Sequence, residues 1–212
     1  DKRPGTGSHN PEDADPGSFY IGDVGWGTRE ELNVANKASM NFGWPKFEGM
    51  TYNPGYNSTT YEPVVHDRPV LDWRRGTARG LVNGNIVNIG TAQLPGPNFT
   101  GNCATGGTWY SADDFPEDYK DTYFLADYGG RWIYNFGFDQ NDNPTFSRAF
   151  KTNAGPVTGL ATNPISGALY YVNRGATVQK ISYSQNQNRQ PVAVVNSSPL
   201  YGASPLTVSF IG

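Results

Sequence analysis

The chain has 212 residues, enough for a sizeable hydrophobic core, and its 26 glycines and 16 prolines argue against long helices. The net charge is −3 with histidine neutral, and no long run of lysine and arginine occurs, which excludes an electrostatic case for nucleic acid or an anionic membrane surface. A single cysteine, Cys103, excludes an internal disulfide and a cysteine-based zinc site.

The remaining composition predicts an all-β fold. Aromatic residues make up 14% of the chain and charged residues 17%, and turn-forming Asn, Asp, Gly and Pro recur throughout. This balance is typical of many short strands joined by tight turns. No apolar run reaches the roughly 18 residues that a membrane-spanning helix needs, so we expect no membrane span. No signal-peptide pattern opens the chain, and we expect it to be a piece of a longer protein.

The first predicted element is a hairpin in the stretch GSFYIGDVGWGTREELNV, which begins at Gly17. An aromatic and aliphatic strand leads into a glycine-rich turn that carries Asp23, and a second strand with Glu30 and Glu31 follows. The stretch NFGWP, residues 41–45, then predicts another tight turn that bears aromatic residues.

The next stretch, residues 46–102, is rich in Tyr, Pro, Asn and Gly and predicts further strands with long connecting segments. Its aromatic residues Tyr52, Tyr56, Tyr61 and Trp73 have two interpretations. In the first, they are exposed and stack on the apolar faces of sugar rings, which match a flat π surface. In the second, they pack the loops onto the fold.

Two strand groups follow in a repeated order. Residues 104–111 predict a strand, 112–121 a loop and 122–136 a hairpin, and residues 155–172 repeat this logic with a turn at 163–167. Asp127 and Asn173 hold equivalent positions 46 residues apart. Four-stranded propeller blades repeat at roughly 40 to 50 residues, so the spacing predicts a β-propeller.

The character of the sequence changes near Ser184, where the polar stretch SQNQNRQ has no apolar periodicity. We therefore expect three parts: 1–184 as propeller, 185–190 as a linker, and 191–212 as the start of a second domain that the chain does not complete.

Two stretches carry a family resemblance. FYIGDVGWGTREELNVANKASMNFGWP and GGTWYSADDFPEDYKDTYFLADYGGRWIY resemble motifs of the glucose/sorbosone dehydrogenase family. That family is similar to the soluble quinoprotein sugar dehydrogenases, and the likeness covers residues 17–183. It implies the C-terminal half of a six-bladed β-propeller. The tail PVAVVNSSPLYGASPLTVSF resembles the first strands of a PKD-type Ig-like β-sandwich.

The resemblance implies an oxidoreductase that uses calcium-bound pyrroloquinoline quinone to oxidise an aldose at its anomeric carbon. The backbone carbonyls of Gly25 and Trp26 would hold the cofactor calcium, and Glu31 and the Phe42 carbonyl a structural calcium nearby. The general base would be a histidine in the preceding half of the fold, outside this chain. The implied partner is a small or polymeric carbohydrate, and the implied location is secreted, extracellular or periplasmic.

The chemistry of the first hairpin is consistent with calcium, which takes six to eight oxygen ligands from carboxylates and carbonyls. Glu30 and Glu31 are neighbours on a strand and point to opposite faces, so at most one can face the turn. In the competing interpretation both glutamates are solvated, Asp23 caps a turn, and Trp44 fills the core.

The sequence departs from the family at the positions where the family's lysine and arginine residues pair with the carboxylates of the quinone. The family's lysine position holds Gly129, and residues 152–156 contain no arginine. Substitutes are Arg131 and the arginines of HDRPVLDWRRGTARG, although these also fit a solvated loop. The alternative function is therefore a non-catalytic extracellular propeller that binds carbohydrate or protein.

Overall fold

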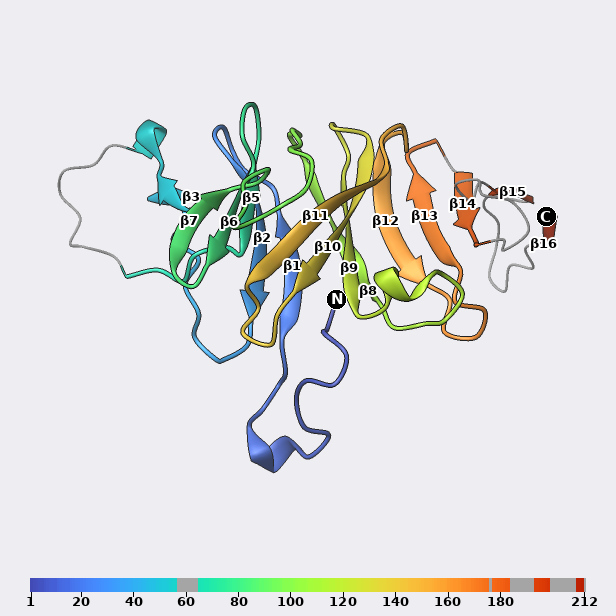
Figure 1. The fold of residues 1–212 in the computed structure, drawn as a ribbon, viewed down its shortest axis with the longest axis horizontal. Coiled ribbons are helices and arrows are strands. Elements are labelled where there is room, and N and C mark those ends of the chain that lie inside the picture. Colours follow the sequence, from blue (N-terminus) through green and yellow to red (C-terminus); the bar gives the residue numbers. More distant parts are fainter. Residues whose placement is uncertain (57–64, 176, 184–192, 199–208, 212) are drawn as a thin grey trace.

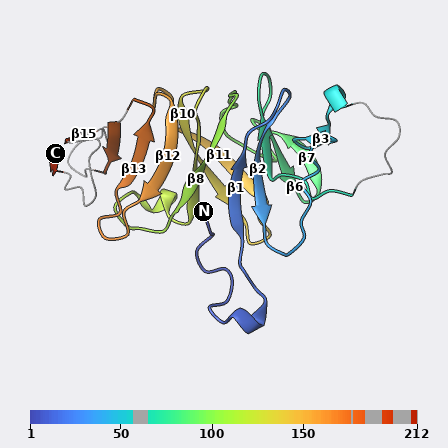
Figure 2. The ribbon, with the colours of Figure 1, turned by 180° about the vertical axis from the view of Figure 1, so that it is seen from behind.

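The computed structural model describes residues 1–56, 65–175, 177–183, 193–198 and 209–211. Its described residues form three larger antiparallel sheets and one two-stranded ribbon, with short 3-10 turns as the helical structure. The all-β expectation is confirmed. The three sheets lie side by side along the longest axis of the molecule, seen from opposite sides in Figure 1 and Figure 2.

The first sheet has the order β1-β2-β5-β6-β7. Its strands are β1 (Phe19–Asp23), β2 (Glu30–Ala35), β5 (Leu71–Trp73), β6 (Arg79–Val82) and β7 (Asn85–Asn88). The predicted hairpin is present, with Asp23 opposite Glu31 as its last pair and residues 24–29 as its loop. The ribbon of β3 (Phe47–Glu48) and β4 (Thr51–Tyr52) and the turn η2 (Pro54–Tyr56) lie in the long connection to β5.

The middle sheet has the order β11-β10-β9-β8. Its strands are β8 (Ala104–Tyr110), β9 (Thr122–Asp127), β10 (Trp132–Phe138) and β11 (Pro144–Lys151), with the turn η3 (Glu117–Tyr119) between β8 and β9. Every residue of β9 and β10 is buried. Their near-continuous apolar sequence, without alternation of polar residues, reflects strands that are covered on both faces.

The third sheet begins with β12 (Val157–Thr162), β13 (Leu169–Asn173) and β14 (Thr177–Ile181), as the repeated order predicts. The backbone of β15 (Ala193–Ser198) pairs with β14, and β16 (Ser209–Ile211) pairs with β15. The predicted linker 185–190 and most of the predicted second domain 191–212 lie outside the described residues.

Two hydrophobic cores separate the three sheets, and β9 contributes to both. Tyr123 and Leu125 belong to the core between the first and middle sheets. Phe124 and Ala126 belong to the core between the middle and third sheets. Successive side chains of a strand point to opposite faces, so one strand can fill two cores.

The first strands of the three sheets adjoin one another, because β8 packs against both β1 and β12. Within the described residues no sheet closes on itself. The loops 24–29, 74–78, 128–131 and 152–156 all lie at the upper edge of the sheets in Figure 1. No helix in the described ranges has the length and apolar character to cross a lipid bilayer.

Buried polar contacts join the first and middle sheets. The indole Nε1 of Trp73 donates to Asp127 Oδ2 at 2.8 Å, and the amide of Ala104 donates to Glu30 Oε2 at 2.9 Å. Trp73 is completely buried, so the interpretation of this residue as an exposed sugar platform is wrong. Its ring instead packs on Phe99 and Trp132.

Candidate functional site

The loop 24–29 is shaped by one glutamate. Glu48 Oε1 accepts hydrogen bonds from the consecutive amides of Gly27, Thr28 and Arg29, the first and last at 2.9 and 2.8 Å. Gly25 lies so close to this arrangement that an added Cβ would collide with the Arg29 carbonyl and Glu48 Oε1. The sequence GDVGWG therefore folds into a compact loop around a carboxylate.

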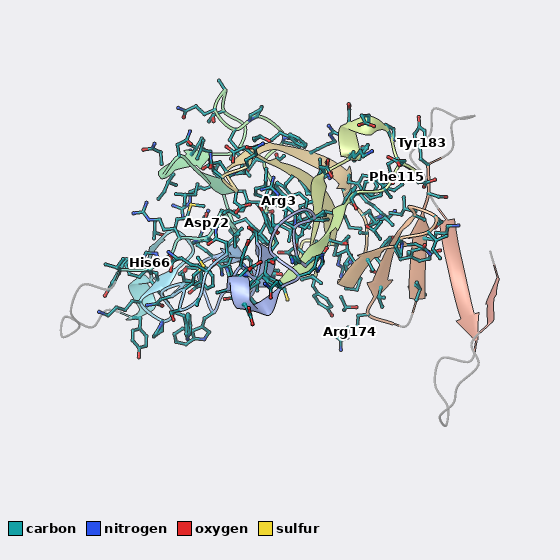
Figure 3. The ribbon with its side chains drawn as sticks, turned by 90° about the horizontal axis from the view of Figure 1, so that it is seen from below. Arg3, His66, Asp72, Phe115, Arg174 and Tyr183 are labelled. Carbon is teal, nitrogen blue, oxygen red and sulfur yellow. The ribbon has the colours of Figure 1, made fainter. Side chains whose placement is uncertain are left out.

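An ion cluster anchors the base of the same loop. Arg29 reaches Asp72 Oδ1 at 2.6 Å, and Arg79 donates to the same oxygen through Nε at 2.9 Å. The amide of Met50 donates to Asp72 Oδ2 at 2.8 Å. Figure 3 shows that Asp72 lies at the same end of the molecule as His66, far from Phe115 and Tyr183. Arg79 is therefore not a solvated loop arginine.

A cleft of about 680 Å³ lies beside this loop. Gly25, Trp26, Glu31 and Phe42, the four residues predicted from the sequence, all line it. The other lining residues are Asp23, Val24, Trp44, Pro45, Glu48 and Tyr56. Its volume is in the range of roughly 300 to 1,000 Å³ that is usual for small-molecule sites.

Glu31 is a buried carboxyl group at the cleft. Its Oε1 accepts the amide of Gly49 and its Oε2 accepts Nδ2 of Asn33 at 3.0 Å. Burial raises the pKa of Glu31 to about 7, and the carboxylates of Asp23 and Asp72 add to the rise. Glu30 is also buried and faces the middle sheet, so the interpretation with two solvated glutamates is wrong. The expected division of the pair between opposite faces is observed.

Glu48 is the residue that sequence reasoning missed. It is 2% exposed, and its Oε2 has no hydrogen-bond partner among the described residues. Burial works to raise its pKa, but the amides of Thr28, Arg29 and Gly27 outweigh burial and hold the pKa below its ordinary value. An ionised oxygen is thus buried at the cleft without a partner, which is costly unless a cation accompanies it. No local pattern pointed to it, because its contacts with the loop join residues about 20 positions apart in sequence.

These oxygens fit calcium. In the described part of the chain no hydrogen bond ends on the carbonyl oxygens of Gly25, Trp26 or Phe42, which lie outside the strand pairings. Glu31 and Glu48 add carboxylates, so the donors are all oxygen, as calcium prefers. No three His, Cys, Asp or Glu side chains in the described ranges converge as a metal group, so a cation here depends on the carbonyls.

The same cleft does not fit an anionic quinone. Among the described residues its charged lining consists of Asp23, Glu31 and Glu48, which are all acidic, without a lysine or arginine. Pyrroloquinoline quinone carries three carboxylates, and burying them beside further carboxylates without counter-charges is unfavourable. Gly25 and Trp26 therefore remain candidate calcium ligands rather than parts of a complete quinone site.

Two tryptophans form the rim of the cleft. Trp26 is 69% exposed and Trp44 58% exposed, and their rings meet edge to face with centroids 6.0 Å apart. Trp44 does not fill the core, contrary to the competing interpretation. Tyr56 is exposed and lines the cleft, while Tyr52 is exposed outside it and Tyr61 lies outside the described residues.

His66 does not line the cleft. Its ring stacks on Phe47 at a centroid distance of 3.7 Å, and an added Cβ at Gly43 would touch it. Burial and the charge of Arg68 lower its pKa. This histidine packs the turn 41–45 against β3, and the described residues that line the cleft include no histidine.

Comparison with known proteins leaves the family of this chain open. No family model matches, and no curated protein matches. A solved structure of a luciferin-regenerating enzyme aligns with 83% of this chain at 15% identity and a TM-score of 0.36. The chain spans 44% of the length of that structure.

Proposed function

We propose that the protein binds carbohydrate in the cleft beside loop 24–29, with a calcium ion held at the cleft. The observation that carries this proposal is the pair of exposed indoles, Trp26 and Trp44, at the mouth of a cleft lined by Glu31 and Glu48. Large exposed aromatic rings grouped around a cleft that also contains carboxylates favour a ligand with both apolar faces and hydroxyl groups.

Each part of the cleft has a separate task in this proposal. The indole faces stack on the C–H face of a sugar ring, and Tyr56 extends the apolar wall. Glu48 Oε2, Glu31 and the carbonyl of Gly25 hold the cation. A bound calcium ion supplies further coordination positions that sugar hydroxyl oxygens can occupy.

We also propose that the three sheets are consecutive blades of a β-propeller. The meander order of the middle sheet, the adjoining strands β1, β8 and β12, and the two cores between successive sheets support this proposal. We also propose a PKD-like second domain and a secreted location, and these two proposals rest on the sequence resemblance alone.

Aldose oxidation is the alternative proposal, and the motif GDVGWGTREELN supports it through the resemblance. Its test is dye reduction by the protein reconstituted with quinone and calcium, with aldose as the electron donor. Aldose-dependent reduction would favour oxidation over binding alone. The acidic lining of the cleft leads us to expect none.

The binding proposal is tested by replacing one indole. In calcium, titration with cellopentaose or maltopentaose should change the tryptophan fluorescence, and Trp26→Ala should lower the affinity on the order of tenfold through the lost stacking. Chelation of calcium should weaken binding in the unchanged protein.

Tyr183→Ala is the matched control, because Tyr183 is an exposed aromatic residue at the opposite end of the molecule (Figure 3). It should leave the affinity unchanged. Equal affinities of Trp26→Ala and the unchanged protein, or no response to any oligosaccharide in calcium, would refute carbohydrate binding at this cleft.

A further inference from the structure

A second pocket lies at the same edge of the sheets, with a charge opposite to that of the cleft. It has a volume of about 540 Å³ and is formed by loops of the first and middle sheets together with Thr152. Arg74 and Arg75 line it, and in the described part of the chain no aspartate or glutamate does. In a chain of net charge −3, such a cationic pocket is a local exception.

The two arginines differ in how far their charge is compensated. Arg74 reaches Glu30 Oε1 at 3.3 Å, and this carboxylate is completely buried. Arg75 is exposed, and within the described ranges no carboxylate or carbonyl pairs with it. Arg75 therefore presents its guanidinium group to a ligand from solution.

The walls of the pocket are held in place by the protein itself. Trp132 donates through Nε1 to the Thr100 carbonyl at 2.6 Å, and the amide of Gly101 donates to the Arg74 carbonyl at 3.1 Å. The amide of Asn102 donates to the buried Asp127. A pocket fixed in this way loses little conformational entropy when a ligand binds.

The uncharged polar side chains of the pocket match hydroxyl groups. Thr100, Asn102 and Thr152 line it, and within the described residues neither threonine hydroxyl nor the side-chain amide of Asn102 donates a hydrogen bond. A guanidinium group pairs with a planar carboxylate through two parallel hydrogen bonds. Together these groups fit a molecule with one carboxylate and several hydroxyls.

We propose that this pocket binds the carboxylate of a sugar acid, such as a uronic acid unit, through Arg75. Thr100, Asn102 and Thr152 hydrogen-bond its hydroxyl groups, and Arg74 adds positive charge. The site is separate from the cleft of the proposed carbohydrate function, because loop 24–29 lies between them: Gly25 and Trp26 line the cleft, whereas Gly27 and Thr28 face Arg74 and Arg75.

The proposal is tested by calorimetric titration with glucuronate in the presence of a calcium chelator and about 0.15 M salt. Glucuronate should bind at least tenfold more tightly than glucose, and Arg75→Met should lower its affinity at least tenfold, because a charge-assisted bidentate pair is lost. Trp26→Ala should leave this binding unchanged, which separates it from the cleft.

Arg131→Met is the control for general electrostatic attraction. Arg131 is an exposed arginine beside the lining residues Gly130 and Trp132 but does not itself line the pocket. Equal losses in Arg75→Met and Arg131→Met would overturn the proposal. Equal affinity for glucuronate and glucose would also do so, as would inorganic phosphate or sulfate binding as tightly as glucuronate. Thermal unfolding of Arg75→Met confirms that an affinity loss is not a loss of fold.

Discussion

Glu31 and Glu48 show how neighbouring carboxyl groups of one cleft acquire opposite properties. Glu31 accepts a single amide and one side-chain donor, and burial raises its pKa to about 7. Glu48 accepts three consecutive amides, which hold its pKa below the ordinary value despite burial. Near neutral pH, Glu48 is therefore ionised and Glu31 is close to half protonated.

The raised pKa of Glu31 makes the calcium-free protein less stable as pH rises. The unfolded carboxyl releases its proton near pH 4.5, whereas the folded one keeps it until about pH 7. Between these values the folded state binds more protons, so the free energy of unfolding should fall, by a total on the order of 3 kcal/mol. Urea unfolding from pH 4.5 to 8 in a chelator measures this.

The control for this prediction is a pair of glutamine variants. Glu31→Gln should remove most of the fall, because the amide does not titrate, and the exposed Glu12→Gln should retain it. A pH profile of Glu31→Gln that parallels that of the unchanged protein would show that another group causes the effect.

At the scale of the element, the hairpin β1–β2 and its loop were predictable, and the loop's internal structure was not. The pattern of apolar residues and glycines located both strands, because local periodicity determines them. The carboxylate inside the loop comes from Glu48, which is 20 residues from Thr28 in sequence. Single-sequence patterns contain no signal for such a distant contact.

Two glycines of this loop provide a matched test. In Gly25→Ala the new Cβ would collide with the Arg29 carbonyl, whereas at Gly27 a Cβ would meet nothing within 4 Å. Gly25→Ala should lower the free energy of unfolding by about 1–3 kcal/mol, as overpacking does, and weaken calcium binding. Gly27→Ala should do neither.

Thermal unfolding measures the stability of both variants, and terbium luminescence sensitised by Trp26 and Trp44 measures cation binding. If Gly25→Ala bound terbium like the unchanged protein, the loop backbone would not be part of the cation site. A large loss in Gly27→Ala would instead indicate a contact that the described loop lacks.

At the scale of the whole molecule, Asp127 joins the sheets. Its carboxylate accepts Nε1 of Trp73 from the first sheet and the amides of Asn102, Cys103 and Gly130 around it, and it is completely buried. In the sequence this aspartate marked a repeat position after a strand. The contact with Trp73 was not predictable, because the two residues belong to different sheets and are 54 positions apart in the chain.

Asp127→Ala should be strongly destabilising, by about 3–5 kcal/mol, because several buried donors lose their acceptor together. Asp118→Ala is the control, because that carboxylate is exposed and its ion pair with Arg148 is long, at 4.0 Å. It should change stability by less than about 0.5 kcal/mol. Urea denaturation compares the two. Similar small effects would show that the donors at Asp127 find water instead.

The all-β class and the repeated strand order follow from patterns that are local in sequence. The grouping of Gly25, Trp26, Glu31 and Phe42 at one site was implied only by the family resemblance. The exposure of Trp44 and the burial of Trp73 do not follow from local patterns, because the same residue type serves as a rim or as a core according to which sheet faces it. Burial of an aromatic residue depends on tertiary neighbours that a single sequence does not identify.

The alternation along β9 has one more consequence. Tyr123 and Phe124 are adjacent residues that belong to different cores. Inserting or deleting a single residue before them would exchange the two sets of side chains, sending each ring into a space shaped for the other. The length of this strand is therefore constrained. We expect insertions and deletions in natural variants to fall in the loops around it and not in the strand.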